Sequence, residues 1–173
     1  MYLHVLINGS EKCCAGDKEI LSLSASIVIR NDGPMGMMVT GGVDNLNEEE
    51  KGRIWLDEEV LIGDVIEFSL LDNVKCSTPS INLSNKTHVI IYEYIYVDVL
   101  KNDDVIFSDQ ATSYDQFQIS IEYFQNTGKV LANIEGFYDK PGSELEKINI
   151  INTEFSLSDK LKIIIDGKEL LYK

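Results

Sequence analysis

Carboxylates are the side chains of this sequence with the clearest chemical potential, and they are concentrated in one stretch. Between Asp44 and Glu67 the chain has nine acids against two bases, Lys51 and Arg53. Such a cluster repels itself, so a mechanism that benefits from it is electrostatic attraction of a basic partner. Six of the acids are the predicted partner contacts: Glu48, Glu49, Glu50, Asp57, Glu58 and Glu59. The alternative is a solvated loop that keeps an acidic protein soluble.

The second candidate surface is a row of tyrosines on the longest expected strand, residues 88–100. One face of this strand carries mainly Val and Ile, and the other carries Tyr92, Tyr94 and Tyr96. In a β-sandwich we expect the tyrosine row to be covered by the other half of the protein. The alternative is an exposed interface stripe, because tyrosines offer a large contact area with few rotatable bonds. Trp55, within the acidic stretch, is expected in the core.

Two classes of function fit these surfaces. The first is a non-enzymatic binding protein that neutralises a basic partner by occlusion, such as a bacterial immunity protein or inhibitor that acts on a toxin, or a mimic of DNA. The second is a small-ligand or carbohydrate-binding β module, in which the tyrosines and Trp55 stack on the ligand. The formal net charge of −14 would repel a phosphate backbone, so we expect no direct nucleic-acid binding.

The usual sequence signatures of enzymes do not occur in this chain. It contains no P-loop, no dinucleotide-binding glycine motif, no G-x-S-x-G, no H-E-x-x-H and no C-x-x-C. Its two histidines, His4 and His88, lie in different halves, and its acidic pairs do not have the spacing of a calcium loop. We therefore expect no enzymatic activity, no cofactor and no bound metal.

The cysteines and the chain start bear on the cellular compartment. Cys13, Cys14 and Cys76 are too few for a disulfide framework, which favours a reducing compartment. If Cys13 and Cys14 lie in a strand, their side chains point to opposite faces and cannot chelate one metal. No basic leader with a cleavage site and no apolar run near membrane-spanning length is present. We expect a soluble cytoplasmic protein without a membrane partner, and its oligomeric state stays open.

The composition favours an all-β, mainly antiparallel fold. The chain has 21 Ile and only 4 Ala, and β-branched residues suit strands whereas Ala suits helices. Alternating apolar and polar residues predict strands over residues 3–7, 22–30, 35–40 and 65–71. Only residues 45–51 and 143–147 have the composition of short helices, and Ser143 with Glu146 matches a capping box.

The strand pattern also predicts an internal duplication. A shift of 94 positions aligns Asn8 with Asn102 and Gly42 with Gly136, and one inserted residue then aligns Asp64 with Asp159. Identities are few, so the match depends on the order of strands and turns. Residues 1–74 and 89–173 are then two similar β modules, either in tandem or fused into one sandwich, with residues 75–88 as a linker or crossover.

The first 75 residues resemble a family of small, uncharacterised bacterial β-rich proteins. The resemblance follows the pattern from Leu3 to Gly9 (LHVLING), then Cys14-Ala15-Gly16, the Gly41-Gly42 pair, Trp55 and LIGDVI from Leu61 to Ile66. It implies one folding unit and a bacterial source, and it supplies no catalytic residue. Toxin-immunity proteins share the size and acidity of this chain, which is an analogy of class.

Overall fold

The computed structural model describes residues 2–15, 22–30, 35–42, 53–71, 82–83, 92–111, 114–124, 127–138, 146–156 and 158–169. These residues form twelve strands of six to ten residues each and one strand of two residues, β7. The strands are β1 (Tyr2–Ile7), β2 (Ser10–Ala15), β3 (Ser22–Arg30), β4 (Gly36–Gly42), β5 (Arg53–Glu59), β6 (Val65–Leu71), β7 (Asn82–Leu83), β8 (Tyr92–Lys101), β9 (Asp104–Gln110), β10 (Gln116–Phe124), β11 (Lys129–Tyr138), β12 (Glu146–Phe155) and β13 (Lys160–Glu169).

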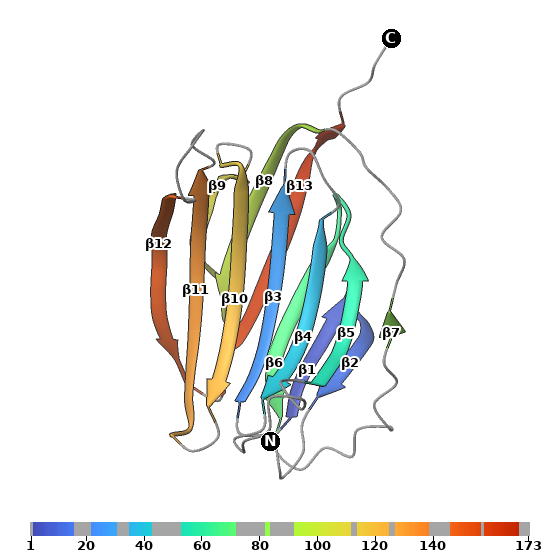
Figure 1. The fold of residues 1–173 in the computed structure, drawn as a ribbon, viewed down its shortest axis with the longest axis vertical. Coiled ribbons are helices and arrows are strands. Elements are labelled where there is room, and N and C mark those ends of the chain that lie inside the picture. Colours follow the sequence, from blue (N-terminus) through green and yellow to red (C-terminus); the bar gives the residue numbers. More distant parts are fainter. Residues whose placement is uncertain are drawn as a thin grey trace.

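The strands form two sheets packed face to face (Figure 1). The six-stranded sheet has the order β2-β1-β6-β13-β8-β9, and the seven-stranded sheet has the order β12-β11-β10-β3-β4-β5-β7. Among the described strands, every pairing is antiparallel except the short one between β5 and β7. The predicted all-β sandwich is therefore confirmed.

The helix predictions fare less well than the strand predictions. Residues 45–51 lie outside the described residues. Of the expected helix at 143–147, Glu146 and Lys147 begin strand β12, where they pair with Tyr138 and Phe137 of β11. Local helix propensity is a weak preference, and pairing along a whole strand overrides it.

The core lies between the sheets because each strand alternates apolar and polar residues. On β3, Leu23, Ala25, Ile27 and Ile29 are at most 3% exposed, and the residues between them are partly exposed. The facing sheet contributes the same alternation from β1, β6, β8 and β13, including the fully buried Ile163. Because successive side chains of a strand point to opposite faces, every second side chain lies between the sheets. Burial of these apolar side chains supplies the main stabilising free energy.

The two halves of the chain repeat one arrangement of strands. In the six-stranded sheet, β2-β1-β6 meets β13-β8-β9 through the pairing of β6 with β13. In the seven-stranded sheet, β12-β11-β10 meets β3-β4-β5 through the pairing of β10 with β3. Each half supplies three strands to each sheet, so both share one core. Of the expected linker at 75–88, only β7 is described, and the duplication itself stays a prediction.

The same turn follows the first strand of each half. Asn8 follows β1 in the left-handed conformation, with φ of 52°, and its amide donates a 2.8 Å hydrogen bond to Asp64. Asn102 follows β8 with φ of 51°, and its amide donates a 2.7 Å hydrogen bond to Asp159. Asparagine tolerates this backbone conformation better than most residues, which explains its use at both turns.

Candidate functional site

The tyrosine row of β8 lies on the outer face of the six-stranded sheet. Ile95, Val97 and Val99 of the same strand are at most 1% exposed and face the core. Tyr96, by contrast, is 47% exposed. The expectation that the other half of the protein covers the tyrosine row is therefore wrong. The aliphatic row of β8 faces the core instead, because a buried tyrosine hydroxyl needs a hydrogen-bond partner and aliphatic side chains do not.

Tyr94 and Tyr96 form one aromatic unit on this outer face. Their ring centroids are 5.4 Å apart and the rings are inclined by 64°, an edge-to-face arrangement. Such a geometry is favourable because the positive edge of one ring meets the negative face of the other. Tyr94 is partly buried, so it supports the more exposed Tyr96. The side chain of the third predicted tyrosine, Tyr92, lies outside the described residues.

Polar residues on the neighbouring strands surround Tyr96. The strand register places it opposite Asp166 of β13 and opposite Gln110 of β9. Two residues along β8, Asp98 accepts a 2.5 Å hydrogen bond from the hydroxyl of Ser108. Residues directly opposite in antiparallel strands share a face and have Cβ atoms about 5 Å apart. The tyrosine unit is thus bordered by carboxylates, an amide and a hydroxyl.

A cation also lies beside this unit but has its own counter-ion. Lys168 of β13 is opposite Tyr94, and its ammonium group lies 2.5 Å from a carboxylate oxygen of Glu93. The hydrogen bond that Lys168 donates to Glu93, together with the negative charge of that carboxylate, raises the pKa of Lys168 above its usual value. We name the set Tyr94, Tyr96, Asp98 and Asp166 the tyrosine–carboxylate patch.

The acids of the other predicted surface do not share one face. Glu48, Glu49 and Glu50 lie outside the described residues. In β5, Asp57 pairs with Met38 and Glu59 pairs with Gly36, on the outer face of the seven-stranded sheet. Glu58 pairs with the fully buried Met37 and therefore points toward the other sheet. Strand alternation therefore separates these three consecutive acids, and the prediction that they form one surface is wrong for Glu58.

Glu58 has a structural partner at the edge of the sandwich. One of its carboxylate oxygens lies 2.7 Å from the ammonium group of Lys12 on β2, which belongs to the opposite sheet. The side chains of Lys12 and Glu58 are 33% and 24% exposed. This ion pair joins the two sheets. Asp64, another acid of the predicted cluster, is used in the turn at Asn8.

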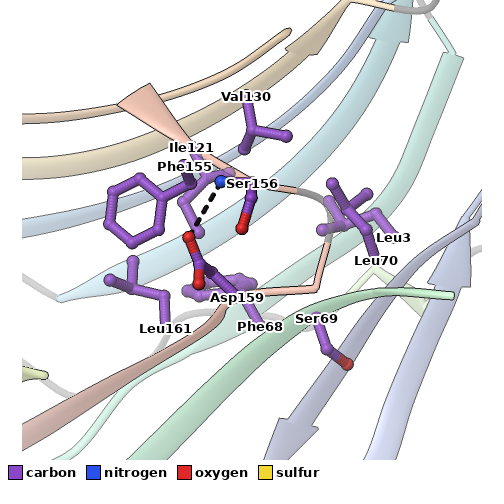
Figure 2. Close-up of a pocket in the computed structure, with 10 residues that line it drawn as sticks. All are labelled: Leu3, Phe68, Ser69, Leu70, Ile121, Val130, Phe155, Ser156, Asp159 and Leu161. Carbon is purple, nitrogen blue, oxygen red and sulfur yellow. Dashed lines mark hydrogen bonds between the residues drawn. The ribbon is translucent and has the colours of Figure 1, made fainter. Parts of the chain in front are cut away.

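The pocket in Figure 2 lies between the sheets beside the turn from β12 to β13. Its volume of about 20 Å³ suffices for about one water molecule and not for a sugar or nucleotide. The lining residues are mainly apolar, with one carboxylate at the rim: Leu3, Phe68, Ser69, Leu70, Ile121, Val130, Phe155, Ser156, Asp159 and Leu161. It has the dimensions of a packing defect.

The carboxylate at this pocket, Asp159, is held in its charged form. Its oxygens accept hydrogen bonds from the backbone nitrogen of Ser156 and from Asn102, and one lies 3.1 Å from the ammonium group of Lys101. Burial raises the pKa of Asp159, but these hydrogen bonds outweigh it and hold the pKa at about 2. A carboxyl with so low a pKa is a poor proton donor at neutral pH. Its role in the structure is to close a turn.

The cysteines differ from expectation in one respect. The register places Cys13 opposite the buried Val5 and Cys14 opposite His4, and the side chain of Cys13 lies outside the described residues. Cys14, however, is disulfide-bonded. A stable disulfide is typical of an oxidising compartment, so the cysteines do not support a reducing one. The cytoplasmic location stays a prediction.

Within the described ranges, no group of three or more His, Cys, Asp or Glu side chains is arranged to hold a metal ion. No helix in the described part of the chain is both long enough and apolar enough to cross a membrane.

Comparison with known proteins leaves the site to be interpreted from its own geometry. No protein-family model, no curated protein and no solved structure matches this chain. The resemblance of the first 75 residues to small bacterial β-rich proteins therefore stays a prediction.

Proposed function

We propose that this protein is a non-enzymatic binding protein that takes a basic partner protein against the outer face of its six-stranded sheet. The observation that carries the proposal is the Tyr94–Tyr96 unit, in which Tyr96 stays 47% exposed beside Asp98 and Asp166. Tyrosine is enriched where proteins bind each other, because its ring supplies apolar contact and its hydroxyl can hydrogen-bond.

The charge of the chain supports a basic partner. Asp and Glu number 29 against 15 Lys and Arg, so the protein has a strong negative field. Such a field accelerates encounter with a basic protein and makes the rate sensitive to salt. The predicted contacts in the acidic stretch, Glu48, Glu49 and Glu50, would add to this steering. Neutralisation of a bacterial toxin by occlusion of its basic active site is the concrete form that we propose.

A binding experiment tests this function. The wild-type protein is used as bait in a lysate of the source cells at low and high salt, and any basic protein captured is purified and titrated with the bait. We expect the activity of that protein to be inhibited and the association rate to fall with salt. The variant E48K/E49K/E50K should associate more slowly and with a flatter salt dependence.

A matched pair of variants locates the binding face. Tyr96→Ala removes exposed area from the tyrosine unit, whereas Leu131→Ala removes apolar area from the outer face of the other sheet, where Leu131 of β11 lies between the buried Val130 and Ala132. Tyr96→Ala should weaken the complex about tenfold or more, as loss of an interface anchor does, and Leu131→Ala should leave affinity unchanged. Equal affinities for the two variants would place the partner elsewhere.

Carbohydrate binding is the second candidate, because the exposed ring of Tyr96 has the amide of Gln110 and the carboxylates of Asp98 and Asp166 on its borders. Sugars stack their apolar faces on aromatic rings and hydrogen-bond to such polar groups. This function predicts binding to a glycan array that is insensitive to salt and lost in Tyr96→Ala. Binding that falls steeply with salt would favour the basic protein instead.

A further inference from the structure

We propose that the tyrosine–carboxylate patch accepts an arginine side chain of the partner, with the guanidinium group stacked on the ring of Tyr96 and paired with the carboxylate of Asp166. This inference rests on the proposed function and names the chemistry that would be recognised at the same face. It commits to an arginine-bearing protein surface as the occupant, on the ground of charge complementarity.

Asp166 lies close enough to Tyr96 for one ligand group to contact both. The two residues are directly opposite in the β8–β13 pairing and lie on the same outer face. Opposite residues have Cβ atoms about 5 Å apart, and a cation is attracted to a ring within about 6 Å of its centroid. One guanidinium group can therefore contact the ring and the carboxylate together. Asp166 is exposed, and the backbone nitrogen of Gly167 donates a 2.7 Å hydrogen bond to one of its oxygens.

Among the residues that the structure describes, the carboxylates of the patch have no cation of their own. Lys168 of β13 is opposite Tyr94, and Glu93 already serves as its counter-ion at 2.5 Å. Within the described ranges, neither Asp98 nor Asp166 has a lysine or arginine within ion-pair distance. Asp98 has the hydroxyl of Ser108 as its hydrogen-bond partner. The patch therefore presents two carboxylates and an open aromatic ring, a combination that attracts a cation.

The patch suits arginine better than lysine. Guanidinium is planar, so it stacks on an aromatic ring while its edge donates two parallel hydrogen bonds to a carboxylate. It is also less strongly hydrated than an ammonium group, so it loses less on contact with the apolar ring. The ammonium group of lysine is a point charge that can pair with the carboxylate but cannot stack flat on the ring. The juxtaposition of Tyr96 with Asp166 thus selects the planar cation.

A peptide titration followed by NMR tests the inference on the intact chain. Tetra-arginine and tetra-lysine peptides, which carry equal charge, are added to isotope-labelled protein. We expect tetra-arginine to bind about two- to fivefold more tightly and to shift the backbone signals of Tyr94 to Asp98 and of Asp166 most strongly. Tyr96→Ala and Asp166→Asn should each weaken tetra-arginine binding by a similar factor and reduce its preference over tetra-lysine.

Asp104→Asn is the matched control. Asp104 is exposed at the start of β9 and pairs with Lys101, at the other end of β8 from Tyr96. Asp104→Asn removes the same charge as Asp166→Asn. An equal loss of tetra-arginine affinity in the two variants would show that only net charge matters, and it would overturn the inference. Equal affinity for the two peptides would overturn it too.

The outcome for the proposed function is separate from the outcome for the arginine site. If a basic partner is captured through Tyr96 and tetra-arginine does not bind the patch, the arginine site is wrong and the binding function stands. If tetra-arginine binds as expected and no basic protein is inhibited, the site stands and the function is wrong. Circular dichroism of each variant verifies that the fold is retained.

Discussion

Asn102 and Asp159 are joined by a 2.7 Å hydrogen bond across 57 residues of chain, from the amide of Asn102 to Oδ1 of Asp159. The bond fixes the turn after β8 to the turn before β13. Asn102 also accepts a 2.9 Å hydrogen bond from the backbone nitrogen of Lys160. The side chain of Asn102 therefore supplies a donor and an acceptor to one neighbouring turn, in the manner of Asn8 with Asp64 and Val65.

Replacement of Asn102 tests the contribution of these bonds to stability. Asn102→Gly keeps the left-handed backbone accessible and removes only the side-chain bonds, so we expect the free energy of unfolding to fall by about 1–3 kcal/mol. Asn102→Ala adds the cost of the left-handed backbone, about 1 kcal/mol more. Urea unfolding measures both. The exposed Asn152→Ala on β12 serves as control, and an equal loss there would contradict the prediction.

Acid should destabilise the protein in a window set by Asp159. Its pKa in the folded protein is about 2, below the value of about 3.9 for an unfolded chain. The folded state therefore binds the proton less readily, so the stabilisation is complete above about pH 4 and is lost as the pH falls toward 2. Melting temperatures from pH 6 to pH 2 should fall less steeply for Asp159→Asn than for wild type. Parallel curves would exclude this role for Asp159.

The ion pair between the sheets should matter more than an exposed one. Glu58→Gln leaves the partly buried ammonium group of Lys12 beside a neutral amide, and we expect a loss of about 1 kcal/mol. Glu154→Gln breaks the exposed pair with Lys129, whose side chains are 65% and 58% exposed, and should cost at most a few tenths of a kcal/mol. Chemical denaturation compares the two variants, and similar losses would show that the Lys12 pair is equally well solvated.

The disulfide of Cys14 predicts a particular cross-link. The chain has two other cysteines, Cys13 and Cys76. Neighbours in an extended strand point to opposite faces, which separates their sulfur atoms beyond bonding distance. We therefore expect peptide mapping under non-reducing conditions to recover Cys14 joined to Cys76, with Cys13 alkylated as a free thiol. Recovery of a Cys13–Cys14 bond would contradict this expectation and require a local departure from strand geometry.

The strands predicted over residues 3–7, 22–30, 35–40 and 65–71 were recognisable because their alternation is strong. The row from Leu23 to Ile29 has the same period in the sequence and in the core. Strand β2 was not expected, because its residues include Ser10, Glu11 and Lys12 and show little alternation. Its place depends on pairing with β1, which is a tertiary interaction that a local pattern does not contain.

The candidate site was harder to predict than the fold. Both rows of β8 are largely apolar, so the pattern alone did not decide whether Val97 or Tyr96 faces the core. The bond between Asn8 and Asp64 spans 56 residues, a separation beyond any local motif. The signal that could have found it is the recurrence of Asn and Asp at matching positions, Asn102 and Asp159, in the second half.

Each sheet contains strands from both halves of the chain, so cleavage between the halves would split both sheets. A fragment that ends after β6 would have unpaired edges at β3 and β6, where β10 and β13 lie in the whole chain. Unpaired edges with apolar faces seek another strand. The two fragments, produced separately, should therefore reassemble as a split protein, and two copies of one fragment should dimerise by offering each other the strands that the missing half would have supplied.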